Sequence, residues 1–175
     1  MNLKVIKFLF FTLLVLAFCP CRSATVGKLA PEFEAKLING EKFSLAKNSG
    51  QVVLIHFWAS WCEACKTEMP LLDSYFKNHH DEGLQLIAIS MDTAKHESKA
   101  RELMMKYSFS SGFAREASFK SFGRIWRLPL TFLIDRNRIL QKDGWILDHN
   151  MTLDDLEKVI GPLLKEKKTA SLEFK

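Results

Sequence analysis

The sequence predicts an α/β fold with a mixed central sheet and helices on both faces. Two unbroken apolar runs, VVLIHFW (52–58) and LQLIAISM (84–91), have the composition of strands buried on both faces of a sheet. Apolar residues at helical spacing follow each run. A strand, a helix and a second strand in succession require a parallel pair with a right-handed crossover, whereas a hairpin pattern near the C-terminal end adds antiparallel strands. The sheet is therefore expected to be mixed.

The first element is expected to be a β-hairpin within residues 32–45. Its two short alternating runs flank Asn39-Gly40, a dipeptide typical of hairpin turns. The helix after each buried run is predicted from residues that share one helical face: Leu72, Tyr75, Phe76 and His79 in the first, and Ala100, Leu103, Met104 and Tyr107 in the second.

A second hairpin and a last helix are expected to complete the chain. Residues 130–135 and 139–146 lie on either side of a tight polar turn. Thr152 and Asp155 are spaced as a capping pair at the start of the helix. Gly161-Pro162 is expected to end or bend it. The apolar positions of this helix are Leu153, Leu156, Val159, Ile160 and Leu163.

Length and composition indicate one globular domain. The chain has 175 residues, of which 47% are hydrophobic and 26% charged. Its formal net charge is +5, but residues 1–23 contribute three cations and no acid, which leaves +2. This remainder is too small to argue for a nucleic-acid partner. The basic cluster at residues 165–168 is interpreted as part of a solvated C-terminal tail, residues 166–175.

Residues 1–23 are interpreted as an export signal. A positively charged start is followed by an apolar stretch, residues 8–18, and by small residues that fit cleavage before Ala24. An uncleaved N-terminal anchor is the first alternative, although a spanning helix needs about 20 apolar residues. A lipoprotein signal with Cys19 as the lipidated residue is the second. The predicted domain then covers residues 24–165.

The motif with the clearest chemistry is FWASWCEACKTEMP (57–70), where Cys62 and Cys65 stand two residues apart. The other two cysteines, Cys19 and Cys21, lie in the predicted signal. A structural zinc site would need four ligands, which the remaining residues do not offer at suitable spacing. A disulfide closing so short a loop stabilises little. Redox chemistry is therefore favoured, in an oxidising compartment outside the cytoplasm.

The local sequence predicts which cysteine attacks. Ser60 and Glu63 have the spacing of a capping box, which would place Cys62 in the first turn of the helix. Free backbone N–H groups and the helix dipole favour a thiolate there. Because the thiolate is the attacking species in disulfide exchange, Cys62 is the predicted nucleophile. Cys65, one turn further, is expected to be more buried and to resolve the mixed disulfide.

The segment FWASWCEACKTEMPLL (57–72) resembles the active site of the TlpA/ResA-like thioredoxins, which are exported or membrane-tethered thiol-disulfide oxidoreductases. The stretch at 30–45 resembles that family's N-terminal hairpin, and LPLTFLIDRNRIL (128–140) resembles its segment around the cis-proline. The similarity runs from about Val26 to Leu164. It implies a thioredoxin-like fold with a strand–helix insertion before the cis-proline.

The resemblance also implies site residues. Pro129 would be the cis-proline, with Leu128 before it, and the two would face the cysteines and bind substrate. Glu68, one helical turn after Cys65, corresponds to a glutamate that the family holds close to the cysteine pair. A carboxylate there would raise the thiolate pKa and pass protons during exchange. A surface position without a role is the alternative for Glu68.

Three tryptophans near the motif have more than one interpretation. Trp61 is expected to contact partners, and Trp58 is more readily explained as core. Trp126, two residues before Leu128, is compatible with a binding groove and with packing.

Two positions depart from the family. Ala64 lies between the cysteines where a proline is frequent, which leaves the strength of the redox couple open. Arg138 stands where a turn glycine is usual, so Asn137 is expected to take the left-handed conformation.

These observations predict an exported enzyme that reduces protein disulfides through Cys62 and Cys65 without a further cofactor or metal. The resemblance implies apocytochrome c as a substrate and a membrane thiol donor of the DsbD/CcdA type, in the periplasm or at the outer face of the cytoplasmic membrane. The alternatives are a thiol peroxidase related to AhpC/TSA, a Sco-like copper chaperone and a disulfide-forming oxidant. Against the peroxidase, Ala59 stands where a threonine would be required. Against the copper protein, the cysteine spacing differs, although His149 is available.

Overall fold

The computed structural model describes residues 24–144 and 152–166. The expected signal or anchor (1–23) and nearly all of the expected basic tail (166–175) lie outside the described residues. No helix in the described part of the chain is long and apolar enough to span a membrane.

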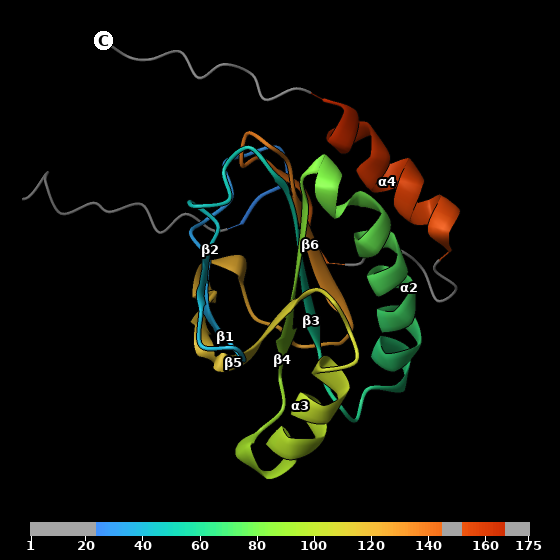
Figure 1. The fold of residues 1–175 in the computed structure, drawn as a ribbon. Coiled ribbons are helices and arrows are strands. Elements are labelled where there is room, and N and C mark those ends of the chain that lie inside the picture. The colour runs from blue at the N-terminus through green and yellow to red at the C-terminus, as the bar shows by residue number, and fades with distance from the viewer. Residues whose placement is uncertain (1–23, 145–151, 167–175) are drawn as a thin grey trace, which may run out of the picture.

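A single mixed sheet organises the described chain. Its strand order is β2-β1-β5-β4-β3-β6-β7 (Figure 1). The strands are β1 (Glu34–Leu37), β2 (Lys42–Ser44), β3 (Val52–Trp58), β4 (Leu84–Ser90), β5 (Ser110–Ser118), β6 (Leu130–Ile134) and β7 (Leu140–Lys142). The helices are α2 (Glu63–His79), α3 (Glu97–Met104) and α4 (Leu153–Lys165), with 3-10 turns η1 (His80–Glu82), η2 (Ala94–His96) and η3 (Lys120–Phe122).

The directions of the strands confirm a mixed sheet. Strand β3 runs parallel to β4, and β4 runs parallel to β5, whereas β6 lies antiparallel to β3 on the other side. In this register Ile55 of β3 lies beside Ile87 of β4 and Phe132 of β6. The start of β6 therefore lies next to the end of β3, because antiparallel neighbours run in opposite directions.

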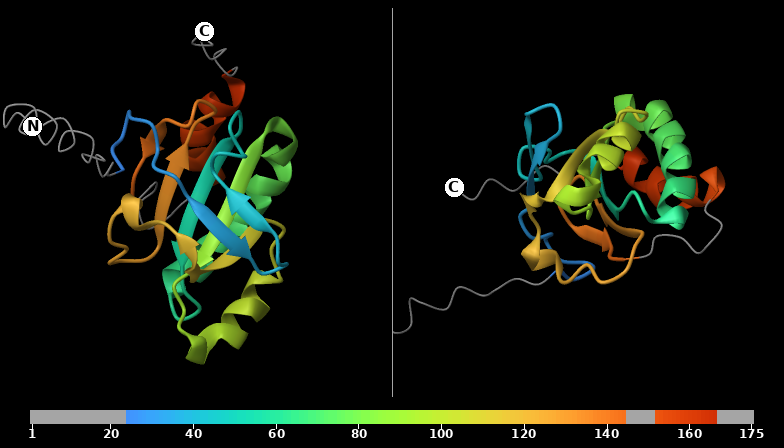
Figure 2. Two further views of the ribbon diagram at one scale, coloured as in Figure 1. Left: turned by 90° about the vertical axis from the view of Figure 1, so that its left-hand side faces the viewer. Right: turned by 90° about the horizontal axis from the view of Figure 1, so that it is seen from below.

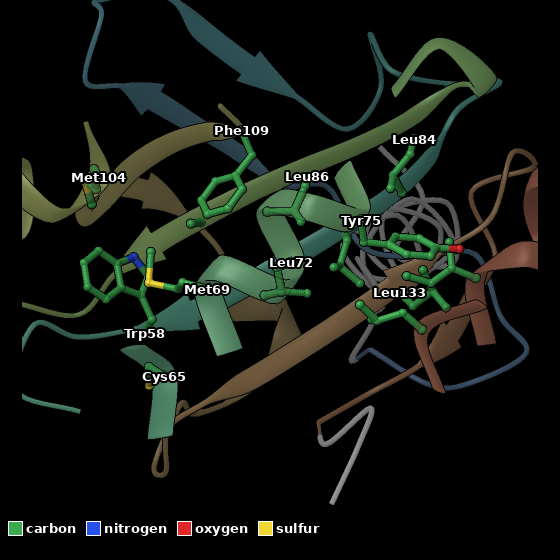
Figure 3. Close-up of a cluster of buried hydrophobic side chains, with 14 of the residues drawn as sticks. Trp58, Cys65, Met69, Leu72, Tyr75, Leu84, Leu86, Met104, Phe109 and Leu133 are labelled. Carbon is green, nitrogen blue, oxygen red and sulfur yellow. The ribbon is translucent and has the colours of Figure 1, made fainter. Parts of the chain in front are cut away.

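The sheet separates two hydrophobic clusters. On one face, Leu54 and Trp58 of β3 pack with residues of α2, α3 and α4. Figure 3 shows Trp58, Met69 and Cys65 together in this cluster. Figure 1 shows α2 and α4 beside each other on that side of the sheet. Since β3 is buried on both faces, its side chains have no polar alternation.

The opposite face is covered by the 3-10 turn η3 and the N-terminal segment. Phe57 of β3 and Phe132 of β6 meet Phe122 of η3 and Phe33 there. The rings of Phe122 and Phe132 pack edge-to-face with centroids 5.0 Å apart, and those of Phe33 and Phe122 lie 6.1 Å apart. Figure 2 shows the chain from β5 to β6 passing over this side.

Strand β5 is missing from the element order predicted from spacing, although the family resemblance implied an inserted strand. Its sequence, SSGFAREAS, has neither an unbroken apolar run nor strict alternation. The glycine in it has a steric cause. A Cβ at Gly112 would lie 2.8 Å from the backbone oxygen of Lys36, where β1 and β5 shift register.

Several turn and cap predictions can be compared with the structure. The hairpin of β1 and β2 turns at Gly40, which has φ 90°. The capping box of Thr152 and Asp155 is present. Of the two effects expected of Gly161-Pro162, an end of the last helix is wrong, because α4 continues to Lys165 with Pro162 inside it, and a bend stays a prediction.

The expectation that Asn137 takes the left-handed conformation is also wrong: Arg138 itself has φ 65°. Two contacts hold this turn. The amide of Arg138 donates to the carbonyl of Asp135, and its guanidinium pairs with Glu32.

A histidine lies in the middle of β3, on the face that packs against α2. His56 is completely buried, and its Nδ1 lies 3.0 Å from Oγ1 of Thr131 on β6. Its Nε2 has no hydrogen-bond partner in the described residues. Burial lowers the pKa of His56 to about 4, because desolvation disfavours the charged imidazolium. The ring is therefore neutral at physiological pH.

We expect His56 to make the fold sensitive to acid. In the unfolded chain its pKa returns to about 6.5, so between pH 6.5 and 4 only the unfolded chain binds the proton. The free energy of unfolding should then fall as the pH falls through this window, by up to about 3 kcal/mol. In His56→Asn this part of the slope should be absent. Urea denaturation between pH 7 and 4 measures it, and equal slopes in both proteins would contradict the assignment.

Candidate active site

The predicted cysteine pair forms a disulfide at the start of α2. The Cα atoms of Cys62 and Cys65 are 5.3 Å apart. Cys62 is 8% exposed, whereas Cys65 is completely buried. Only the first cysteine of the pair can therefore be reached from solvent, as expected from the sequence.

The structure corrects how this helix begins. Its N-cap is Cys62, not Ser60, and the helix starts at Glu63. The Sγ of Cys62 accepts a hydrogen bond from the backbone N–H of Cys65 over 3.2 Å. The sulfur thus occupies the position where a serine or aspartate oxygen normally satisfies a free amide at a helix N-terminus. This places it closer to the positive end of the helix dipole than a first-turn position would.

Ser60 is held instead by Asp92, a residue that sequence reasoning missed. The backbone N–H of Ser60 donates to Oδ2 of Asp92 over 2.7 Å, and its hydroxyl donates to Oδ1 over 2.8 Å. The hydroxyl of Ser90, the last residue of β4, also donates to this carboxylate. All three residues are buried. The signal in the sequence was a serine that ends a buried strand and an aspartate two residues later, at the end of the sheet where α2 starts.

The predicted proline segment lies at the same edge of the sheet. The Leu128–Pro129 peptide bond is cis, as the resemblance implied. Leu130 pairs with Phe57, so Pro129 lies near the end of β3, from which the chain continues to Cys62. Leu128 is half-buried and packs against both hydrophobic clusters, including the one that contains the two cysteines.

The structure separates the three tryptophans. Trp58 is completely buried, whereas Trp61 is 59% exposed and Trp126 is 72% exposed. The packing interpretation therefore holds for Trp58. It fails for Trp126, whose ring has the guanidinium of Arg127 over it at 5.3 Å from the centroid. Exposed indole rings are typical of surfaces that contact other proteins.

Glu68 lies on α2 and is half-buried. It stands one turn beyond Cys65, whose buried face continues through Met69 and Leu72. Pro70 lies inside the helix on its exposed side. Within residues 24–144 and 152–166, no three or more histidine, cysteine or acidic residues are grouped so that they could hold a metal ion. His149, considered for copper, lies outside the described residues.

The fold and the cysteine pair define a thioredoxin-like thiol-disulfide oxidoreductase. The chain belongs to the AhpC/TSA family, whose model matches residues 26–143. It is 29% identical to the thiol-disulfide oxidoreductase ResA of Bacillus cereus over 89% of this chain and 82% of that protein. It is 30% identical to the thioredoxin-like protein YneN of Bacillus subtilis, over 66% of this chain and 68% of that one.

Solved structures agree with this classification. A candidate thiol:disulfide interchange protein DsbE from Chlorobium tepidum superposes with a TM-score of 0.65 and 26% identity, covering 81% of this chain and 99% of that one. The resemblance to TlpA/ResA-like thioredoxins and the predicted thioredoxin-like fold with a mixed sheet are thereby confirmed. Helices on both faces were expected, but the buried hydrophobic residues of α2, α3 and α4 all belong to one cluster, and the 3-10 turn η3 covers the other face.

We expect the Asp92 carboxylate to support the sulfur at the helix start. Asp92→Ala leaves the buried amide of Ser60 without an acceptor, which should cost about 1–3 kcal/mol of stability. Without this contact the chain before Cys62 is held less firmly, so the sulfur should lie less regularly at the helix N-terminus. The pKa of the Cys62 thiol should then rise, because the helix N-terminus stabilises the thiolate less. The rate of thiol alkylation against pH, measured on the reduced protein, reports that pKa.

Asp73 offers a matched control. It is also buried, and it accepts bonds from the amide and hydroxyl of Ser108, over 2.6 and 2.7 Å. Asp73→Ala should lower stability similarly and leave the alkylation curve in place. A curve that moves equally in both variants, or in neither, would show that Asp92 has only a structural role.

Proposed function

We propose that this protein is an exported enzyme that reduces disulfides in other proteins through Cys62 and Cys65. One observation carries the proposal: the sulfur of Cys62 caps the N-terminus of α2 and Cys62 is partly accessible to solvent, whereas Cys65 is completely buried. The relatives named thiol-disulfide oxidoreductase support the same class of reaction.

The proposed reaction has two steps. The Cys62 thiolate attacks one sulfur of a substrate disulfide, which forms a mixed disulfide and releases the other substrate sulfur as a thiolate that takes up a proton. Cys65, after losing its proton, attacks Cys62 Sγ, so the second substrate sulfur leaves and is protonated. The substrate gains two electrons and two protons, and the Cys62–Cys65 disulfide is regenerated. No cofactor beyond the cysteine pair is needed.

The environment of each sulfur supports this division of roles. The cap position gives Cys62 a backbone donor and the positive end of a helix, both of which favour a thiolate. Cys65 has no exposed surface, so it reaches only a sulfur already bound to Cys62.

The substrate is proposed to bind along the cis-proline segment. Pro129 has no N–H, and the chain there lies at the end of β3 beside the cysteines. A substrate segment in extended conformation can pair with such an edge and present its disulfide to Cys62. Leu128 and the exposed ring of Trp61 would provide apolar contacts on either side.

Localisation and partners are proposed from the sequence. Residues 1–23 have the features of an export signal, or alternatively of a retained anchor. The enzyme would act in the periplasm or at the outer face of the cytoplasmic membrane. It would receive electrons from a membrane thiol donor of the DsbD/CcdA type and reduce substrates that include apocytochrome c. N-terminal sequencing of the native protein should find Ala24; an intact Met1 on membrane-bound material would favour the anchor.

The family match is the observation that speaks for a peroxidase instead. The residue pattern speaks against it, because Ala59, three positions before Cys62, is buried and offers no hydroxyl. A peroxide-consumption assay on the reduced protein separates the two reactions.

A disulfide-forming oxidant would use the same residues in the opposite direction. The reduction potential of the Cys62–Cys65 couple, compared with that of its partners, decides between these directions.

The cysteine roles are tested by two serine variants. Cys62→Ser should abolish disulfide reduction, because no accessible thiolate remains. Cys65→Ser should accumulate mixed disulfides with native partners, because nothing resolves them. Non-reducing electrophoresis followed by mass spectrometry detects these adducts. Trapping by Cys62→Ser and none by Cys65→Ser would reverse the assignment.

Glu68 is proposed to tune the same thiol. Its carboxylate would oppose a second negative charge at the helix start, which raises the pKa of the Cys62 thiol. It would also exchange protons with the thiols during the reaction. Its half-buried place, one turn from Cys65, supports this role.

We expect Glu68→Gln to lower the pKa of the Cys62 thiol and to slow reduction of the physiological partner, with the fold intact. The measurement is the alkylation rate of the reduced protein against pH. Asp81→Asn, which removes an exposed carboxylate beyond the far end of α2, is the control and should not shift the curve. Identical curves for wild type and Glu68→Gln would remove Glu68 from the site.

A further inference from the structure

The segment between β5 and β6, residues 119–128, crosses the face of the sheet opposite α2, near the end where the cysteine pair lies. We call this segment, FKSFGRIWRL, the basic loop. It begins at the end of β5 and ends at Leu128, which packs against the cluster that contains both cysteines. A macromolecule that brings its disulfide to Cys62 therefore also comes close to this loop.

The basic loop carries three cations and no acidic residue. Lys120, Arg124 and Arg127 are all exposed, and no aspartate or glutamate occurs in the sequence from residue 117 to residue 134. Among the described residues, no carboxylate forms an ion pair with Lys120 or Arg124. The nearest acid along the chain, Glu116, already lies 3.8 Å from Lys36.

Four described acids lie elsewhere at this end of the sheet. Glu63, at the start of α2, is paired with Lys66 at 2.5 Å. Asp143 follows the short strand β7 and is exposed. The other two, Asp92 and Glu68, are buried and half-buried and so contribute less to the exposed surface.

The basic loop also carries an exposed aromatic ring. Trp126 is 72% exposed, and Arg127 covers part of its ring. Trp61, immediately before Cys62, is 59% exposed. Large exposed indoles close to cations are found where proteins bind other proteins, because the ring supplies contact area and the cation supplies charge selection.

The loop is fixed in place before any partner binds. The ring of Phe119 packs on Phe57 of β3 at 5.1 Å, and Phe122 is buried against Phe33 and Phe132. The carbonyl of Ser121 accepts a bond from the amide of Ala24 over 2.9 Å. A preformed surface loses little conformational entropy on binding.

From these observations we propose that the basic loop, together with Trp61, binds protein substrates that carry acidic residues beside their disulfide. The proposal rests on the proposed function, and it names the substrate class for the same site. Opposite charge raises the rate of encounter and selects partners, more than it adds to final affinity. The aromatic rings then contact the apolar part of the bound segment. Substrate choice is thus set by a loop outside the reacting pair.

The test compares two cyclic disulfide peptides of equal length, one with glutamates beside each cysteine and one with serines. The full chain, reduced beforehand, should reduce the acidic peptide about tenfold faster at low salt, and the ratio should approach one at high salt. In the double variant Lys120→Glu/Arg124→Glu the preference should disappear or reverse. The double variant Lys28→Glu/Lys158→Glu changes the net charge equally at exposed positions away from the site, and should keep the preference.

A neutral small-molecule disulfide, used as a substrate, distinguishes failure of the proposed function from failure of the proposed docking surface. If wild type does not reduce it, the proposed function itself fails. If wild type reduces it but treats both peptides alike at low salt, only the docking proposal is overturned.

Sedimentation with phosphatidylcholine vesicles, with and without phosphatidylglycerol, tests whether the basic loop binds a membrane surface in place of a protein. Binding to anionic vesicles that is lost in Lys120→Glu/Arg124→Glu, without any peptide preference, would also overturn the proposal. An equal loss of preference in both double variants would attribute it to net charge, and would overturn it as well.

Discussion

The bond from the amide of Cys65 to the sulfur of Cys62 is the contact on which the site depends. A helix N-terminus leaves several amides without partners, and whichever atom caps them lies at the positive end of the dipole. Here that atom is the sulfur that must carry negative charge in the proposed reaction. In this structure the same sulfur also forms the disulfide with Cys65, within one helical turn.

The sheet topology explains why the remaining site residues gather around this sulfur. Parallel strands β3 and β4 end at one edge, and antiparallel β6 begins there. The chain that leaves β3 supplies Trp61 and Cys62, the residues after β4 supply Asp92, and the residues before β6 supply Leu128 and Pro129. Inserted β5 places the basic loop near the same end, because the chain must return from the far side of β4 to β6. Three separate stretches of sequence thus meet at one edge without a dedicated domain.

The sequence predicted those elements whose side-chain pattern is strong and local. Strand β3 was predicted with the bounds it has, because every one of its residues is buried, and the capping box of α4 follows from two residues three apart. Strand β5 was missed because its partners are distant, and only the approach of Lys36 explains its glycine. The role of Asp92 was missed for a similar reason: its bond to Ser60 joins residues that are 32 positions apart. Exposure of Trp126 likewise depends on what the rest of the chain leaves uncovered.

Ser60 shows how a distant contact can decide local structure. Its hydroxyl has the chemistry of an N-cap, and with Glu63 three residues later the local sequence favours a helix that starts at Ser60. Asp92 binds both the amide and the hydroxyl of Ser60, so that neither remains for the helix. The cap then moves two residues along the chain to Cys62, whose sulfur is a weaker acceptor than an oxygen. The buried carboxylate of Asp92, which follows β4, thus prevents Ser60 from capping α2. The helix is capped by a reactive sulfur in place of a hydroxyl, and its start is thereby suited to redox chemistry.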